Sequence, residues 1–241
     1  MKRLTMAILA TLLVLSIGQA VMAEDFNPTI GLKLGYIHDK ADFDGQIFTS
    51  NQFKLGLLGQ FDFSERIGLF AQIGMDLGKI TNMLEDETVS KFDLIANISV
   101  KYNVFLNDTF TVAVQAGVSG SYHSDGFDNK DNLLFIVPGL YADVNLGPKF
   151  NLYTNIKFPI FYYGHIDWVD IESSMGFFKV FLYDVLLGVS YEISPNISLS
   201  IEGAMDNTKP HILSLIVFAS KNDVPYSYSA FNIGLKLNYK F

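Results

Sequence analysis

The sequence contains four histidines that could take part in acid–base chemistry, and all four lie in polar stretches or at the ends of apolar segments: His38, His123, His165 and His211. Three of them have an aspartate one or two positions further along the chain, at Asp39, Asp125 and Asp167. A histidine held by a carboxylate can act as a general base toward water. No matching pair of carboxylates can be identified, so we assign no catalytic residue and predict that these histidines are polar loop residues.

Most charged residues follow a different pattern, because they occupy one phase of segments that alternate between polar and apolar residues. In residues 92–102, Asp93, Asn97 and Lys101 share one phase, and apolar residues fill the other. A period of two places the phases on opposite faces of a strand, and a charge facing the bilayer midplane costs about 2–4 kcal/mol. The charges predicted to face a polar lumen are Lys33, Lys54, Asp62, Asp76, Asp93, Lys101, Lys157, Asp184, Glu202 and Lys236.

These lumen charges are mixed in sign and are spread over most of the alternating segments. A barrel of about this size has a narrow interior, so we expect the charges to neutralise one another in a hydrogen-bonded network. The alternative is a wet, conducting pore. No arginine lies in the lumen phase, which argues against a strong anion constriction.

Ten alternating segments lie between residues 27 and 241, and their connections differ in length. Short turns near residues 64–66, 106–108, 145–149 and 194–196 alternate with polar stretches at 39–51, 78–90, 123–131, 164–176 and 206–224. Outer-membrane barrels have an even number of strands, short periplasmic turns and long outer loops. We therefore predict an all-β fold, a transmembrane antiparallel up-and-down β-barrel of ten strands, with eight or twelve as alternatives and both termini in the periplasm.

Two features fit this barrel less well. Pro138 and Pro159 fall inside predicted strands, where a closed barrel has no free edge, so we expect bulges at both. The apolar phase around Pro159 is expected to run from Leu152 through Ile156 to Tyr162. Residues 211–220 are apolar enough to form another strand, and we expect them to continue the ninth strand above the membrane.

The first 23 residues have the composition of a signal peptide. Lys2 and Arg3 precede an apolar stretch at residues 6–17, and residues 21–23 form a small-x-Ala cleavage sequence. We predict that residues 1–23 are removed and that residues 24–241 form the barrel. The chain has no cysteine, which excludes disulfides and thiolate chemistry. Loss of Lys2 and Arg3 would change the net charge from −8 to −10, which disfavours nucleic acid as a partner.

The last segment carries a recognisable ending. Gly234, Leu237, Tyr239 and Phe241 follow the spacing of a polar residue, a glycine and alternating hydrophobic residues. This ending resembles the signal that the barrel-assembly machinery reads in its clients. The whole chain is similar to the small outer-membrane β-barrel proteins of didermal bacteria, the superfamily of the opacity, OmpX and OmpW types. The resemblance implies an outer-membrane location, with outer-membrane lipid and lipopolysaccharide around the barrel and the loops outside the cell.

The polar stretch at 164–176 is the best candidate for a contact surface. It is acidic and contains the only tryptophan, Trp168, together with Ile171 and Met175. Aromatic and methionine side chains are enriched in binding patches, so we predict that this loop contacts an extracellular ligand. The alternative is that Trp168 folds back against the barrel rim.

We favour a non-enzymatic surface, structural or adhesion-type role. A narrow diffusion pore is the first alternative, and an outer-membrane hydrolase is the second, either an omptin-like protease or a lipid A modifying enzyme. Omptins use an Asp–His pair and a pair of aspartates across the barrel rim, but here the order is His-x-Asp at two places. No cofactor or metal is expected, because no loop has the ligand order of a dedicated calcium site.

Overall fold

The computed structural model describes residues 27–43, 45–82, 87–125, 130–166, 171–177, 182–206 and 226–241. The strands are β1 (Asn27–Phe43), β2 (Gln46–Asp62), β3 (Ile67–Asn82), β4 (Glu87–Leu106), β5 (Phe110–Asp125), β6 (Lys130–Asn145), β7 (Phe150–Lys157), β8 (Phe161–Ile166), β9 (Ile171–Phe177), β10 (Asp184–Ser194), β11 (Ile197–Asp206) and β12 (Tyr226–Lys240). The part of the chain described contains no helix with the length and hydrophobicity of a membrane span. The predicted leader, 1–23, and the apolar run 211–220 lie outside the described residues.

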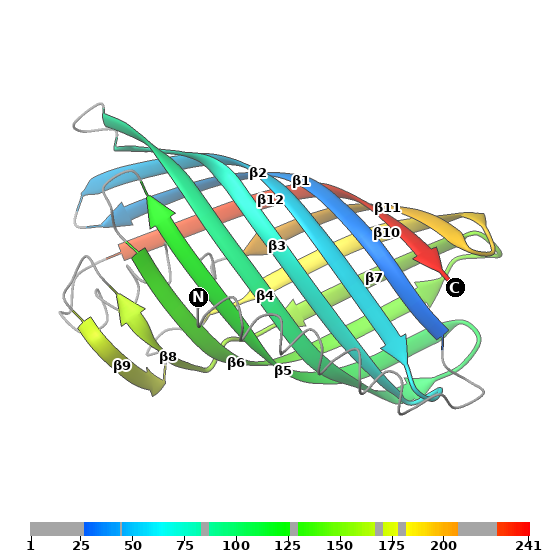
Figure 1. Ribbon diagram of the computed structural model, residues 1–241. Helices are drawn as coiled ribbons and strands as arrows, with labels where there is room; N and C mark the ends of the chain where they lie inside the picture. The colour runs from blue at the N-terminus through cyan, green and yellow to red at the C-terminus, as the bar shows by residue number, and fades with distance from the viewer. Residues whose placement is uncertain are drawn as a thin grey trace.

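Ten of these strands form a closed antiparallel barrel (Figure 1). Neighbours in sequence pair from β1 to β7, β10 pairs with β7 and β11, and β12 closes the wall against β1. The remaining two strands, β8 and β9, extend the wall beyond β7, because β6 pairs with β7 along one half and with β8 along the other. The prediction of a ten-stranded up-and-down barrel is confirmed.

The two ends of the barrel differ. The short-turn end holds the connections at residues 63–66, 107–109, 146–149 and 195–196, and the C-terminus lies there too. The opposite end, which we call the hairpin end, holds the paired strand ends of β1 with β2, β3 with β4, β5 with β6 and β8 with β9 (left in Figure 1). Much of what we expected to be long loop is strand here. Residues 39–51, for example, are a hairpin that turns at Gly45, whose φ of +83° suits glycine.

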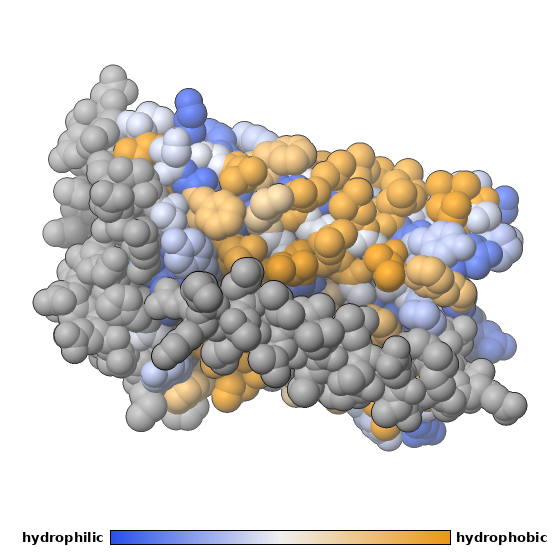
Figure 2. Space-filling view, in the orientation of Figure 1, coloured by the Kyte–Doolittle hydropathy of each residue, from blue (hydrophilic) through white to orange (hydrophobic). Residues whose placement is uncertain are grey.

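Side chains alternate between the outer face and the lumen along the wall. On β12, Phe231, Ile233 and Leu235 are about half exposed on the outside, whereas Asn232 between them is buried. Figure 2 shows apolar side chains across the middle of the visible face of the barrel, with hydrophilic residues nearer the ends. A belt of this kind is the surface that a lipid bilayer requires.

The strands are strongly tilted, as the register shows. From Lys33, directly paired residues lead through β2 to β5 and reach β6 at Leu133. In the other direction, through β12 and β7, they reach β6 at Asn145, an offset of twelve residues. Ten strands with this stagger give a tilt within the range of about 35–45° that closed barrels adopt. Residues in the same layer therefore come from different positions along their strands.

One bulge accommodates both prolines. Residues 158–160 stand opposite only Val137 and Pro138, since the register passes from Gly139↔Lys157 to Ile136↔Phe161. The amide of Phe158 donates a hydrogen bond to the carbonyl of Pro138 at 2.9 Å. Pro138 has no N–H group and so donates none in return. β6 and its pairing with β5 continue unbroken through Pro138, so the separate bulge expected in that strand is wrong.

Because this bulge contains an extra residue, each side chain after it lies on the opposite side of the wall from the one that regular alternation predicts. Tyr153 and Tyr162 are both buried, at 8% and 7% exposure, although they are nine positions apart. Tyr163, rather than Tyr162, faces outward. Our placement of Tyr162 in the lipid-facing phase is therefore wrong, because a bulge shifts the alternation by one residue.

Closure by β12 generates the first prediction. Removing residues 226–241 should prevent formation of a heat-modifiable barrel on gels, because β1 and β11 would both have unpaired edges within lipid. Deleting Phe241 alone should abolish outer-membrane assembly in cells but permit refolding in detergent, since that residue lies just beyond β12. Normal surface assembly of the Phe241 deletion would contradict the predicted assembly signal, and Lys240→Gln serves as a matched control.

Candidate functional site

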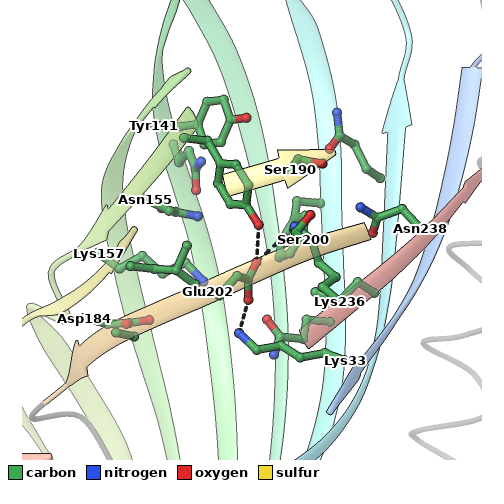
Figure 3. A pocket seen from close by; sticks show the side chains of 18 of the residues that line it. Lys33, Tyr141, Asn155, Lys157, Asp184, Ser190, Ser200, Glu202, Lys236 and Asn238 are labelled. Carbon is green, nitrogen blue, oxygen red and sulfur yellow. Dashed lines mark hydrogen bonds and ion pairs between the residues drawn. The ribbon is translucent and has the colours of Figure 1, made fainter. Parts of the chain in front are cut away.

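The centre of the lumen is organised around Glu202 on β11. Its carboxylate forms ion pairs with Lys33 of β1 and with Lys236 of β12, the latter at 3.0 Å, and it accepts a hydrogen bond from Tyr153 at 2.6 Å. Lys33 and Lys236 face one another directly across the closing pair of strands. Like charges at such a position repel, and the carboxylate between them offsets that repulsion. Figure 3 shows the contacts of Glu202 with its neighbours as dashed lines.

A second layer of charge lies nearer the hairpin end. The His123 ring nitrogen Nδ1 is 2.6 Å from Asp93 Oδ1, and Lys91 Nζ is 3.1 Å from the other oxygen of the same carboxylate. Lys91 also lies 4.0 Å from Asp39, which accepts a hydrogen bond from Gln52 at 2.9 Å. All five side chains are buried. A buried charge is tolerated where it has partners of this kind.

The histidines and aspartates that are close in sequence are not the ones that pair in the structure. His38 and Asp39 are adjacent on β1 but face opposite ways, because His38 is exposed and bonds Asn51 whereas Asp39 is buried. The carboxylate on His123 is Asp93 of the neighbouring strand, a pairing that nearness in sequence did not suggest. The side chain of His165 lies outside the described part, as do Asp167 and His211.

Apolar side chains complete the packing at the hairpin end of the lumen. Inward-facing residues there are almost fully buried: Ile37, Ala41, Leu133, Phe135, Val137, Tyr162, Leu182, Ala204 and Ala230. They account for most of the buried hydrophobic residues of the described chain. The interior at this end is therefore a packed core of mixed composition.

The rest of the lumen contains a polar cavity of about 260 Å³. Its lining includes Gly68, Asn151 and Asn238, all within a few residues of the short turns. The exposure of charged side chains falls along the axis, from 36% for Asp62 and 16% for Lys101, through 9% for Lys54, to zero for Asp76 and Asp93. Among the described residues, the charged side chains of the lumen are thus exposed toward the short-turn end and buried toward the hairpin end.

The structure places the predicted lumen residues on the inner wall. Lys101 pairs with Asp62 at 3.6 Å, and Lys54 lies 4.0 Å from Asp76. Lys157 lies over the ring of Phe70, 5.7 Å from its centre, and is in register with Asp184. Lys54, Lys101, Lys157, Asp184, Glu202 and Lys236 line the large cavity, whereas Asp93 belongs to the sealed layer.

The residues of the predicted assembly signal lie at the end of β12. Leu237, Tyr239 and Phe241 are exposed on the outer face at the short-turn end, and the rings of Tyr239 and Phe241 meet edge to face at 4.9 Å. Gly234 stands opposite Gly35, where a Cβ on Gly234 would lie only 3.0 Å from the carbonyl oxygen of Leu34. The predicted contact residues Ile171 and Met175 belong to β9, opposite Ile166 and Tyr163, while Trp168 lies outside the described ranges.

The described residues offer no obvious metal centre. Within them, no three His, Asp or Glu side chains are arranged to hold a metal ion. The Asp93–His123 pair has the geometry of a general base with its orienting carboxylate. The histidine side chain is only 4% exposed, however, and that of the aspartate is not exposed at all.

A closed antiparallel barrel with an apolar outer belt and a charged lumen defines an integral outer-membrane β-barrel protein. The chain belongs to the family described as outer membrane protein beta-barrel domain, whose model matches residues 7–241. Membership in this family implies a location in the bacterial outer membrane. Comparison with the sequences of curated proteins gives no significant match.

Several solved structures share the fold at low sequence identity. The outer membrane protease OmpT from Escherichia coli is 12% identical, with a TM-score of 0.58 over 92% of this chain and all of that one. The COG4313 outer membrane channel from Pseudomonas putida F1 is also 12% identical, with a TM-score of 0.51 over 91% of this chain and 97% of that one. Because one is a protease and the other a channel, these similarities define the fold and not the role.

The sealed layer generates the second prediction. Asp93→Ala should lower the free energy of unfolding by about 3–5 kcal/mol, because Lys91 and His123 would keep their burial but lose their shared carboxylate. Asp62→Ala breaks a similar pair that is partly exposed, and it should lower the free energy of unfolding by less than about 1 kcal/mol. Denaturant unfolding of the refolded proteins in detergent measures both. Equal effects would show that burial does not control the strength of these pairs.

Proposed function

We propose that this protein is a non-enzymatic outer-membrane barrel with a structural or adhesion-type role at the cell surface. The observation that carries the proposal is the complete burial of Lys91, Asp76 and Asp93 across the hairpin end of the lumen. The apolar residues of the same region are buried with them, and we infer that together these side chains block a path through the described interior. The part of the barrel available to other molecules is then its extracellular surface and not a channel through it.

The proposal places the hairpin end outside the cell and the short turns in the periplasm. Short periplasmic turns and longer outer connections are the rule for outer-membrane barrels. The short-turn end also holds Leu237, Tyr239 and Phe241, where we infer that the barrel-assembly machinery would engage the chain. Outer-membrane lipid and lipopolysaccharide would surround the apolar belt.

The same burial argues against the two alternative functions. A diffusion pore needs a continuous wet path, and the cavity of about 260 Å³ does not extend to the layer of Asp93. A hydrolase needs a base that substrate and water can reach, and the His123 ring lies beneath the surface. A hydrolytic activity of the purified protein that His123→Ala abolished would overturn the non-enzymatic proposal.

The hairpin of β8 and β9 is the element we propose for contact with an extracellular ligand. Among the described strands, β9 pairs only with β8, so it is the edge of an otherwise closed sheet. An exposed edge offers backbone N–H and C=O groups to a partner. Trp168, between these strands in sequence, and Ile171 and Met175 on β9 would supply the apolar part of the contact.

A sealed lumen generates the third prediction. The protein in planar bilayers should show no steady single-channel steps, because ions cannot pass the buried layer of charge without disrupting it. Lys101→Glu, at the accessible end, should remain equally silent. Reproducible steps whose size or selectivity changed in Asp93→Lys would contradict the proposal and favour the pore.

The contact hairpin generates the fourth prediction. Trp168 fluorescence should be red-shifted and quenchable by acrylamide in the isolated barrel, and it should shift to the blue when lipopolysaccharide is added, because contact removes the ring from water. Ile171→Ser should weaken this response, whereas Leu146→Ser, at an exposed residue of a short turn, should leave it unchanged. An emission that is already blue and unquenchable without ligand would mean that Trp168 packs against the barrel.

A further inference from the structure

The cavity at the short-turn end has lysines without matching carboxylates. Lys33 and Lys236 share the single carboxylate of Glu202, which leaves this group of three with one excess positive charge. Lys157 lines the same cavity and lies over the ring of Phe70, and no carboxylate of the described residues is within ion-pair distance of it. Figure 3 shows Lys33, Lys157 and Lys236 on three different strands around Glu202.

Other lysines of the cavity are already paired. Lys101 has Asp62 at 3.6 Å, and Lys54 has Asp76 at 4.0 Å. Asp184 and Asp206 also line the cavity, near the ends of β10 and β11 that face the sealed layer. Asp184 stands opposite Lys157 in the register of β7 and β10, so the excess positive charge lies on the group formed by Lys33, Lys236 and Glu202.

Unpartnered polar atoms open onto the same space. The Asn232 amide oxygen and the Ser200 hydroxyl have no hydrogen-bond partner in the described part of the structure, although these residues are only 5% and 1% exposed. Asn155 also lines the cavity with an unpartnered amide oxygen. A buried acceptor without a partner is costly, so these atoms call for a molecule with hydrogen-bond donors in the cavity.

We propose that this cavity is a binding site for a small hydroxylated organic anion, such as a sugar acid. Its carboxylate would lie among Lys33, Lys157 and Lys236, and its hydroxyls would donate to Asn155 and Asn232 and to Ser200. The volume of about 260 Å³ is slightly below the usual range for ligand sites, which restricts the ligand to a small solute. The solute enters from the short-turn end, because the other end is sealed.

The test is calorimetric titration of the refolded full-length barrel in detergent with sodium gluconate, and with glucose and sodium acetate as comparison ligands. Gluconate should bind more tightly than either, because only gluconate carries both the charge and the hydroxyls. Binding should weaken as salt is added. Failure of gluconate to bind, or equal binding of glucose, would overturn the proposal and leave the cavity to water.

Two lysine variants sharpen this experiment. Lys157→Gln removes a cation that has no carboxylate of the described residues within ion-pair distance, so it should fold normally and weaken gluconate binding about tenfold or more. Lys101→Gln removes a cation that is already neutralised by Asp62 and should change the affinity by much less. Heat-modifiable mobility of both variants verifies folding. Equal losses in the two variants would show that general lumen charge, rather than this site, attracts the anion.

Discussion

The structure depends on the pairing of every backbone N–H and C=O group within the membrane. Lipid offers no hydrogen-bond partners, so a sheet can cross it only if the sheet closes on itself. Here closure is the pairing of β1 with β12, which runs from Thr29↔Lys240 to Phe43↔Tyr226. Once the wall is closed, each strand has one face in lipid and one in the lumen, and within the bilayer charged residues are tolerated only on the inner face. The ion pairs of the lumen are therefore a consequence of closure, because the charges have no other place to go.

Within that constraint the two halves of the lumen differ in composition. At the hairpin end, charged groups such as Asp93 and His123 are packed with apolar residues such as Phe135 and Leu182, and little surface remains exposed. At the short-turn end, Asn151, Asn155 and Gln115 replace the apolar residues, and a cavity forms. Apolar side chains fill space without needing partners, whereas amides and lysines hold a space open for water or solute. The change in residue type along the axis thus gives the described lumen a packed half and a half that contains a cavity.

Much of this architecture could be predicted from the alternation of residues. Alternation assigns a face to each residue, so it identified Glu202 and Asp93 as inward-facing and predicted the ten strands. It should also have separated His38 from Asp39, since adjacent residues of a strand face opposite ways. The extent of the strands was harder to predict, because polar residues that leave the membrane still pair with one another, as Thr49 and Thr81 do on β2 and β3. Polarity there indicates exposure to water and not a loop.

The contacts between side chains depend on register, and bulges alter register in ways that composition does not reveal. Between β4 and β5 the pairing shifts between Asn103 and Phe105, and only after that shift does Asp93 stand opposite His123. Without it, the turn would place Asp93 opposite Ser124, and the charge would lose its imidazole partner.

The bulge opposite Pro138 acts on facing in the same way. By adding one residue before Phe161, it turns Tyr162 into the lumen and Tyr163 outward, so an aromatic ring joins the sealed region at the hairpin end. The prolines that the sequence marked as misfits in a closed barrel therefore help to close its interior. One inserted residue moves a side chain from the lipid-facing side of the sheet to the packed interior.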